Sequence, residues 1–219
     1  MLKYFSYICM MKNQEIYTRE ELDRFTDFIS IVKKAREFAT LAHEGIFRKG
    51  KDHKGERIEY ITHPIAVARI FHTYKSSHKI GFLIAACMLH DTVEDVEWVT
   101  IEVIREHFGD LIASLVEELT SDPKGIEMYG KEKYLTMKMT TMSTWGLGIK
   151  LADRLHNLSD VQSKIQGGKP SDIKWVIKYC TQTNNIIKGI EEGRTLTNTH
   201  KRLIKIIKKT IQQGLEITI

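Results

Sequence analysis

One segment near the middle of this chain of 219 residues is apolar on every side. Residues 80–89 read IGFLIAACML, and four ionisable groups follow within six positions: His90, Asp91, Glu94 and Asp95. A helix that is apolar all round is typically buried in the core. Burying an unpaired carboxylate or imidazole is costly, so polar groups at the end of such a helix need partners. The segment therefore predicts a helical core with a polar site at its edge.

A divalent cation would satisfy a neutral histidine and an aspartate together. A catalytic ion normally takes three or four protein ligands and keeps a position for water. Two further candidates fit this need: His63 directly precedes Pro64, which favours a first helical turn, and Asp153 lies in a helical pattern of leucines. Together with His90 and Asp91, they are expected to bind one divalent ion.

Each of these residues also has a plain structural interpretation. A His-Asp pair is common by chance, His63 alone is compatible with helix capping, and Asp153 alone is compatible with an ion pair to Lys150 or Arg154. The combination favours the metal site, because the four groups occur in order around the apolar helix. The other histidines are assigned structural roles, except His156, which lies within one turn of Asp153 and is a candidate for orienting a ligand.

The order His, His-Asp, Asp resembles the HD phosphohydrolase superfamily, and the surrounding segments resemble the hydrolase domain of the RelA/SpoT alarmone enzymes. The similar segments are residues 35–39, 48–49, 60–64, 89–95, 107–109 and 150–158. The tail over 187–219 is similar to single-domain, metazoan-type SpoT homologues. With the helical patterns, this resemblance implies an all-α, single-domain HD-domain fold with a helical C-terminal extension.

The resemblance also implies a reaction: metal-dependent hydrolysis of guanosine 3′,5′-bis-pyrophosphate-type alarmones to GDP or GTP and pyrophosphate. The implied cofactor is Mn²⁺, although imidazole and carboxylate ligands also suit zinc, iron or cobalt. Glu94 and Asp95 are implied to act on the attacking water and the leaving group. The implied substrate-binding residues are Arg48, Lys49, Asn157 and Tyr179. A guanidinium stacks well on a purine, whereas Tyr179 can equally be a core aromatic.

The chain departs from the family pattern beside the expected base pocket. Residues 51–57 are extra relative to the usual spacing, and Glu59 stands where the family commonly has proline. These differences leave the preference for guanine or adenine open. Because the chain ends shortly after the hydrolase motifs, we expect it to degrade alarmones without making them.

Two other functions stay open on the sequence. One is an HD phosphohydrolase for another substrate, such as NADPH, an adenosine 3′-pyrophosphate or a 3′-pyrophosphorylated RNA end. The other is a non-catalytic helical module that binds nucleic acid or a partner protein. The formal charge of +5 permits nucleic-acid binding without requiring it. The basic residues near the C-terminus have helical spacing typical of a solvated face, so no stable nucleic-acid complex is expected. These residues are Lys201, Arg202, Lys205, Lys208 and Lys209.

The remaining sequence is mainly helical in pattern. Helices are expected near residues 18–32, 31–45, 64–75, 79–91, 100–108, 110–120, 131–143, 147–163, 172–190 and 196–213. Residues 57–60 are expected to be extended, and residues 48–59 and 121–130 to be loops. Residues 1–17 are expected to be a disordered or loosely packed extension, with Met1, Met10 or Met11 as the start, and 18–219 to form one domain.

Composition indicates an intracellular enzyme. The three cysteines, Cys9, Cys87 and Cys180, show no paired spacing, which favours a reducing compartment and a cytoplasmic location. No apolar run approaches the roughly 20 residues that span a bilayer, so no membrane association is expected. The expected partner is a nucleotide with a 3′-pyrophosphate, and the protein is expected to be a monomer or homodimer.

Overall fold

The computed structural model describes residues 19–52, 54–166 and 170–216. The helices are α2 (Arg19–Ala42), α3 (Thr62–Tyr74), α4 (Ile80–Leu89), α5 (Thr92–Asp95), α6 (Ile101–Phe108), α7 (Asp110–Leu119), α8 (Pro123–Tyr129), α9 (Lys131–Thr141), α10 (Thr144–Gln166), α11 (Pro170–Gly193) and α12 (Asn198–Glu216). The strands β1 (Phe47–Lys51) and β2 (Arg57–Glu59) form an antiparallel pair. The predicted all-α fold is confirmed, while the expected extension over residues 1–17 lies outside the described residues.

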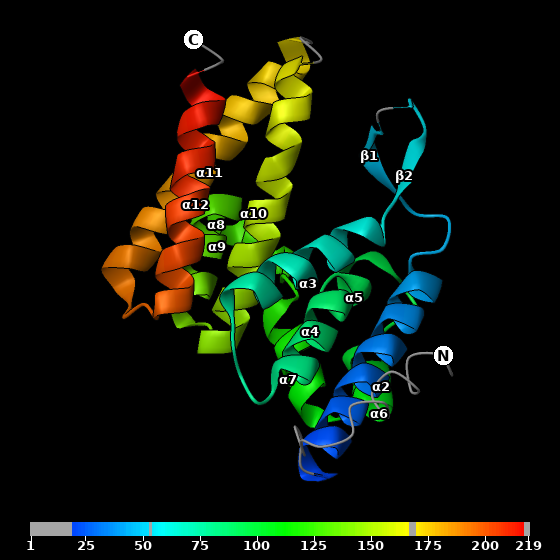
Figure 1. Cartoon of the computed structure of the whole chain (residues 1–219). Helices are drawn as coiled ribbons and strands as arrows, with labels where there is room; N and C mark the ends of the chain where they lie inside the picture. The colour runs from blue at the N-terminus through cyan, green and yellow to red at the C-terminus, as the bar shows by residue number, and fades with distance from the viewer. Residues whose placement is uncertain (1–18, 53, 167–169, 217–219) are drawn as a thin grey trace, which may run out of the picture.

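Helix α4 occupies the centre of one layer, where it packs against α2, α3 and α7 (Figure 1). Residues 83–89 are all buried, as the apolar run predicts, and Phe82 alone keeps a large exposed surface. Gly81 allows α2 to approach closely, because a Cβ atom there would lie 2.9 Å from Cδ2 of Phe28. Burial of each large apolar side chain contributes about 1.5–3 kcal/mol. This burial fixes the position of whatever follows the helix.

The predicted helix over 79–91 is wrong at its C-terminal end, because α4 stops at Leu89 and α5 begins at Thr92. Side chains replace the missing helical hydrogen bonds at this break. His90 Nδ1 lies 2.8 Å from the carbonyl oxygen of Cys87, and Thr92 Oγ1 donates to the carbonyl oxygen of Leu89 at 2.7 Å. The last carbonyls of a helix need such partners. The chain therefore turns at the His-Asp pair instead of continuing as one helix.

Helix α10 connects this layer to a second one. It packs against α3 and α7 on one side and against α11 and α12 on the other (Figure 1). The amphipathic pattern of α12 is confirmed, since Leu203, Ile204, Ile207 and Ile211 are buried. Cys87 and Cys180 are buried free thiols, and Cys9 lies outside the described residues. Within the described ranges, none of the helices combines the length and apolar character needed to cross a membrane.

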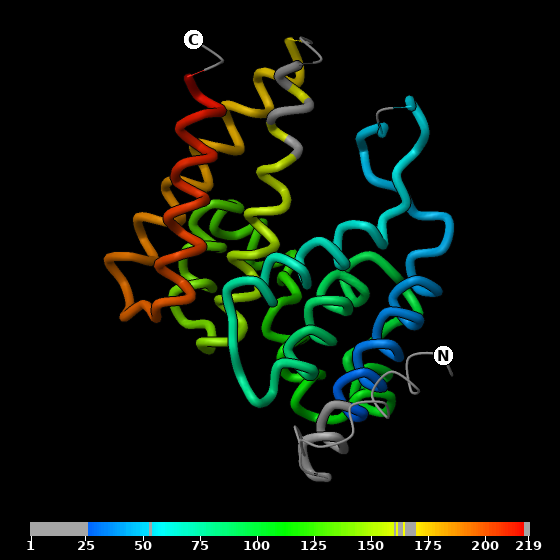
Figure 2. Tube along the Cα trace, in the orientation of Figure 1, coloured from blue at the N-terminus to red at the C-terminus, as the bar shows by residue number. Residues whose placement is uncertain are grey.

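The hairpin formed by β1 and β2 was not predicted, apart from the extended piece over residues 57–60. It projects beside the upper half of α10 (Figure 2). Asp52 Oδ1 accepts from the backbone N–H groups of Lys54 and Glu56, and Gly55 has φ +82°. The Arg57 guanidinium lies 3.7 Å from the centre of the Phe47 ring. Local polar contacts and one cation–π contact thus form the hairpin, without the alternating apolar pattern by which strands are usually predicted.

The predicted loop over residues 121–130 is also wrong, because it contains α8. Pro123 occupies the first turn of this helix, and the Asp122 carboxylate accepts from the backbone N–H groups of Lys124 and Gly125. Both features are favourable at a helix start. None of the α8 residues is buried, so the helix has no apolar periodicity by which the sequence would reveal it. The two expected helices over 18–32 and 31–45 are one continuous helix, α2.

Candidate functional site

The four predicted metal ligands converge, although they come from three separate places in the chain. His63 lies in the first turn of α3, Asp153 on α10, and His90 and Asp91 at the break after α4. His63 Nε2 lies 3.4 Å from Asp91 Oδ2 and 3.2 Å from Asp153 Oδ1. His90 Nε2 lies 3.1 Å from Asp91 Oδ2 and 3.9 Å from Asp153 Oδ1. Ligands about 2.1 Å from one ion lie about 3.0–3.5 Å apart, so the arrangement fits a single small cation.

The orientation of the two imidazole rings also fits a cation. The carbonyl oxygen of Cys87 can only accept, so the Nδ1 atom of His90 carries a proton and its Nε2 presents a lone pair in the neutral ring. This Nε2 atom is buried without a hydrogen-bond partner. His63 Nδ1 lies 2.7 Å from Nδ1 of His156, which orients the His63 ring as the sequence analysis had anticipated. His63, His90 and Asp91 form a buried group able to hold a metal ion.

Electrostatics at the cluster favour a positive charge. Burial alone would raise the pKa of Asp91, but His90 and His63 hold it well below its usual range. Burial likewise opposes ionisation of Asp153, and Lys150 is the main group that keeps the pKa of Asp153 low. The same two carboxylates raise the pKa of His90 to about 10, although burial acts to lower it. A divalent cation would supply the positive charge that these carboxylates attract.

Three further side chains orient the carboxylates. Tyr60 donates its hydroxyl to Asp91 Oδ2 at 2.7 Å, and Asn157 donates its amide to Asp153 Oδ1 at 2.7 Å. Lys150 Nζ lies 3.3 Å from Asp153 Oδ2, and both side chains are buried. The sequence analysis named Lys150 as a possible ion-pair partner of Asp153 and assigned no role to Tyr60. Their position within the family-like segments was the available signal.

Glu94 and Asp95 lie at the rim of the cluster, on α5. Glu94 Oε1 accepts from the backbone N–H of Ser121 at 2.6 Å, so this carboxylate is tied to the segment after α7. Asp95 Oδ2 lies 3.7 Å from Nε2 of His43. Both residues are exposed, in contrast to the buried ligand cluster. They are therefore accessible to a substrate that approaches from solvent.

The structure brings some of the expected substrate-binding residues together and places others apart. Arg48 donates from Nη2 to Asn157 Oδ1 at 3.1 Å, which joins the hairpin to α10. Lys49 is exposed on β1. Tyr179 lies on α11, where its ring stacks on Trp175 at 5.0 Å and lies beneath the Arg154 guanidinium at 5.3 Å. Arg48 and Asn157 thus border the cluster, whereas Tyr179 packs between α10 and α11.

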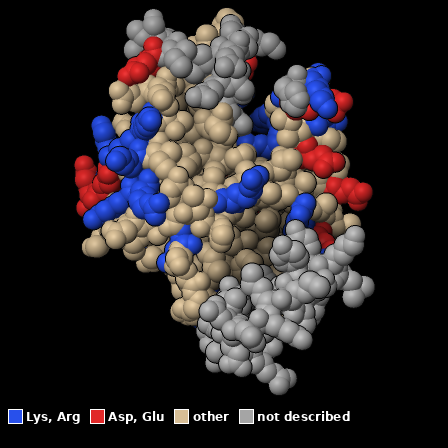
Figure 3. Space-filling view, in the orientation of Figure 1, with Lys and Arg blue, Asp and Glu red and all other residues tan. Residues whose placement is uncertain are grey.

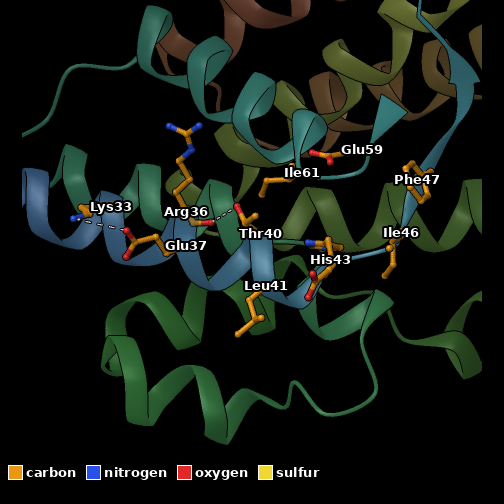
Figure 4. Close-up of a pocket in the computed structure, with 12 residues that line it drawn as sticks. Lys33, Arg36, Glu37, Thr40, Leu41, His43, Ile46, Phe47, Glu59 and Ile61 are labelled. Carbon is orange, nitrogen blue, oxygen red and sulfur yellow. Dashed lines mark hydrogen bonds and ion pairs between the residues drawn. The ribbon is translucent and has the colours of Figure 1, made fainter. Parts of the chain in front are cut away.

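An open pocket of about 620 Å³ lies between the C-terminal half of α2, the start of β1 and the residues before α3 (Figure 4). Its lining includes His43, Phe47, Glu59 and Ile61, and none of the four candidate ligands. The pocket is therefore lined by other residues than the ligand cluster.

Comparison with known proteins identifies the family of the chain. Residues 35–133 match the family described as HD domain. The chain is 32% identical over 187 residues to human guanosine-3′,5′-bis(diphosphate) 3′-pyrophosphohydrolase MESH1, covering 84% of this chain and 95% of that protein. The chain belongs to the MESH1 family of HD-domain proteins. The Xenopus tropicalis member is 34% identical over 173 residues, covering 73% of this chain and 90% of that protein.

A longer relative and a solved structure extend the comparison. The chain is 30% identical over 187 residues to a guanosine-3′,5′-bis(diphosphate) 3′-pyrophosphohydrolase of Haemophilus influenzae, covering 78% of this chain and 25% of that protein. The structure of a metazoan orthologue of SpoT superposes with a TM-score of 0.62 at 23% identity, covering 82% of this chain and 94% of that one. The all-α fold is therefore similar to that of this solved structure over 82% of the chain, and the resemblance to RelA/SpoT enzymes is confirmed.

Proposed function

We propose that this protein hydrolyses guanosine 3′,5′-bis(diphosphate)-type alarmones, releasing pyrophosphate and leaving GDP or GTP. The observation that carries the proposal is the buried cluster of two imidazoles and two carboxylates, with two further carboxylates at its rim. A binding module has no need for such a cluster. The family membership supports the same reaction, since the human and frog relatives carry this activity in their names.

His63, His90, Asp91 and Asp153 would hold the divalent cation, since each imidazole Nε2 lies 3.1–3.9 Å from an oxygen of Asp91 and from an oxygen of Asp153. A cation held there withdraws electron density from phosphate oxygens and makes water more acidic. Nδ1 of His90 is bonded to the Cys87 carbonyl, so the ring cannot turn its Nε2 away from the cluster. His63 is held in the same way by His156. Fixed rings of this kind reduce the reorganisation needed during the reaction.

Glu94 and Asp95 would carry out the proton transfers. Water attacks the phosphorus atom joined to the ribose 3′ oxygen, and Glu94 takes the proton that this water loses. The bond between the phosphorus and the 3′ oxygen breaks, and Asp95, which starts protonated, gives its proton to that oxygen. Glu94 then releases its proton to solvent and Asp95 takes one up, so the proton count balances. Proton transfers of this type contribute about 10²–10⁴ in rate. The Ser121 amide fixes one oxygen of Glu94 and leaves the other for this role.

The nucleotide would lie between the hairpin and α10. Arg48 and Asn157 already meet there, and Lys49 is exposed on the same strand. A guanidinium can stack on a purine ring, while an amide can bond to a sugar or base. Tyr179 is assigned a place in the substrate site only by the family resemblance, and its stacking on Trp175 indicates a mainly structural role. The hairpin, which includes the extra residues 51–57, would set the preference between guanine and adenine.

We infer that the cation is Mn²⁺, on the family resemblance. The donor set of two imidazoles and two carboxylates also suits iron, cobalt or zinc. Metal analysis of the purified protein, followed by activity measurements after chelation and reloading with each metal, tests this assignment. Highest activity with zinc would contradict it.

We also propose that residues 18–219 form one domain, because α10 packs against helices of both layers. A cytoplasmic location is proposed on the free thiols of Cys87 and Cys180, which fit a reducing compartment. Cell fractionation tests the location. Light scattering tests the expected monomer or homodimer.

The function is tested by incubating the protein and Mn²⁺ with guanosine and adenosine 3′-pyrophosphates and separating the products by anion exchange. We expect pyrophosphate and GDP or GTP, and no reaction after chelation. The His63→Ala variant should be inactive, whereas Asp172→Asn, which alters an ion pair on α11, should act as the wild type does. Release of orthophosphate, or unchanged turnover by His63→Ala, would overturn the proposal.

A further inference from the structure

We infer that His43 is a positioning residue for Asp95: it aligns the carboxyl group that is proposed to protonate the leaving group. The sequence analysis gave His43 only a structural role. The inference rests on the proposed function for its catalytic consequence and on geometry alone for the contact itself. His43 directly follows α2 in the segment that leads to the hairpin, and it lines the open pocket together with Ile46 (Figure 4).

The orientation of the His43 ring is determined by its neighbours. The His43 residue is 3% exposed, and its Nδ1 lies 2.9 Å from the carbonyl oxygen of Ala39. Because a carbonyl oxygen only accepts, Nδ1 must be the protonated donor. The opposite nitrogen, Nε2, is directed toward Asp95 Oδ2 at 3.7 Å. This distance is longer than a direct hydrogen bond.

The His43 Nε2 atom is a buried polar atom that makes no hydrogen bond. A buried polar atom without a partner costs free energy, so such an atom in a native protein calls for an explanation. The Asp95 side chain is 34% exposed and retains freedom to turn. A small rotation of Asp95 would close the gap, and its protonated carboxyl would then donate a hydrogen bond to Nε2, which fixes the acid beside the substrate.

The same ring is also coupled to the ligand cluster. His43 stacks on Tyr60 with ring centres 4.7 Å apart and an angle of 22° between the planes. The Tyr60 hydroxyl donates to Asp91 Oδ2. A single stacked pair therefore supports a proposed metal ligand through Tyr60 and a proposed catalytic carboxylate through His43. This arrangement would hold Asp91 and Asp95 in a fixed position relative to one another.

The contact is tested first without any activity measurement. Two-bond ¹H–¹⁵N spectra of histidine-labelled protein report the protonation and environment of each ring nitrogen. We expect Nδ1 of His43 to be protonated and its Nε2 resonance to shift in Asp95→Asn. The control Asp110→Asn, which alters an exposed ion pair with Arg105, should leave the His43 signals unchanged. Identical His43 signals in the wild type and Asp95→Asn would overturn the inference.

The catalytic consequence is tested by a double-mutant cycle. His43→Phe keeps a ring for stacking on Tyr60 and removes both nitrogens; loss of such an orienting residue typically costs 10- to 100-fold in activity. We expect kcat to fall by about this factor with KM and metal content close to those of the wild type. In an Asp95→Asn background, His43→Phe should cost less than about threefold further. Full additivity of the two losses would show that His43 does not act through Asp95.

Two additional measurements keep the outcomes distinct. His107→Phe, which alters an exposed ring packed against Phe38, should retain activity and serves as the control for ring replacement. If His43→Phe does not fold, His43→Gln places an amide near the position of Nε2 and replaces it in the cycle. If the wild-type protein degrades none of the nucleotides, the proposed function fails, and the spectra of Asp95→Asn still decide whether His43 and Asp95 interact.

Discussion

Replacement of Asp153 by alanine tests the metal centre most directly. The side chain is 6% exposed and has four partners in the structure: His63, His90, Lys150 and Asn157. The variant removes one proposed ligand and leaves the buried Lys150 amino group without its nearest carboxylate. Thermal unfolding should report both effects. The loss of the Lys150 ion pair lowers the Tm of the metal-free protein, and the loss of the ligand removes the rise in Tm that metal produces.

The size of each effect follows from these contacts. Breaking a buried ion pair by removing one partner typically costs about 3–5 kcal/mol. The lower end applies here, because the alanine also relieves the repulsion between Asp153 and Asp91, and Asp91 and Glu94 remain near Lys150. For a domain of this size, about 3 kcal/mol corresponds to a Tm lower by about 6–12 °C. In the wild type, metal at a hundred times its Kd stabilises by about 2.7 kcal/mol, or about 5–11 °C.

The assay is differential scanning calorimetry of chelated protein across a Mn²⁺ titration, with metal content measured in parallel. We expect Asp153→Ala to unfold at a lower temperature than the wild type and to show no rise in Tm with metal. Asp172→Ala, which removes a partly exposed ion pair with Lys164, should keep the full metal-dependent rise. If Asp153→Ala binds metal and its Tm rises with metal as much as that of the wild type, the proposed ligand set is refuted.

Three other perturbations have defined expectations. Glu94→Gln should retain metal and lose about 10²–10⁴ in kcat; unchanged turnover would remove Glu94 from the proton transfers. Arg48→Ala should raise KM for the nucleotide with a smaller change in kcat, because it removes the hairpin's contact with Asn157; steady-state kinetics that show only a fall in kcat would assign Arg48 another role. Burial lowers the pKa of His200, whose Nδ1 accepts from the Thr197 N–H. The neutral ring's contribution to stability should therefore be complete above about pH 6.5 and lost as the pH falls through the lowered pKa. Urea unfolding at pH 7.5 and 5.5, with His200→Gln as comparison, measures this loss, and an equal pH dependence in both proteins would contradict it.

The sequence revealed most about positions where burial dictates the residue type. The apolar run before His90 identified α4, and the spacing of isoleucines and Leu203 identified the buried face of α12. The four ligand candidates were found because an unpartnered histidine or aspartate beside a core is costly. These are constraints that act over a few residues and leave a periodic pattern.

Other features depend on contacts between distant residues and left no such pattern. The break after Leu89 depends on two side chains that bond to carbonyls of their own helix, which an uninterrupted apolar run does not indicate. The hairpin is held to α10 by a bond between Arg48 and Asn157, which lie 109 positions apart. The contact of His43 with Asp95 is likewise a product of folding. None of these is visible without the spatial arrangement.

The position of the basic residues explains why net charge was a weak guide to function. Lys201, Lys205 and Lys209 are exposed on α12, on the layer opposite the hairpin, and acidic groups accompany the basic ones at the edges of the face seen in Figure 3. Lys208 pairs with Glu191. The basic residues of α12 thus lie on a solvated helix face, as predicted.

Helix α4 both stabilises the core and places two candidate ligands, and this affects how natural variants in it should be interpreted. Its buried side chains stabilise the fold, and its last turn sets where His90 and Asp91 stand. A conservative change such as Leu83→Val would leave expression nearly normal, yet even a small shift of the backbone would misalign the two ligands. Loss of turnover should therefore precede loss of solubility, and screens based on protein abundance would classify many damaging changes in this helix as harmless.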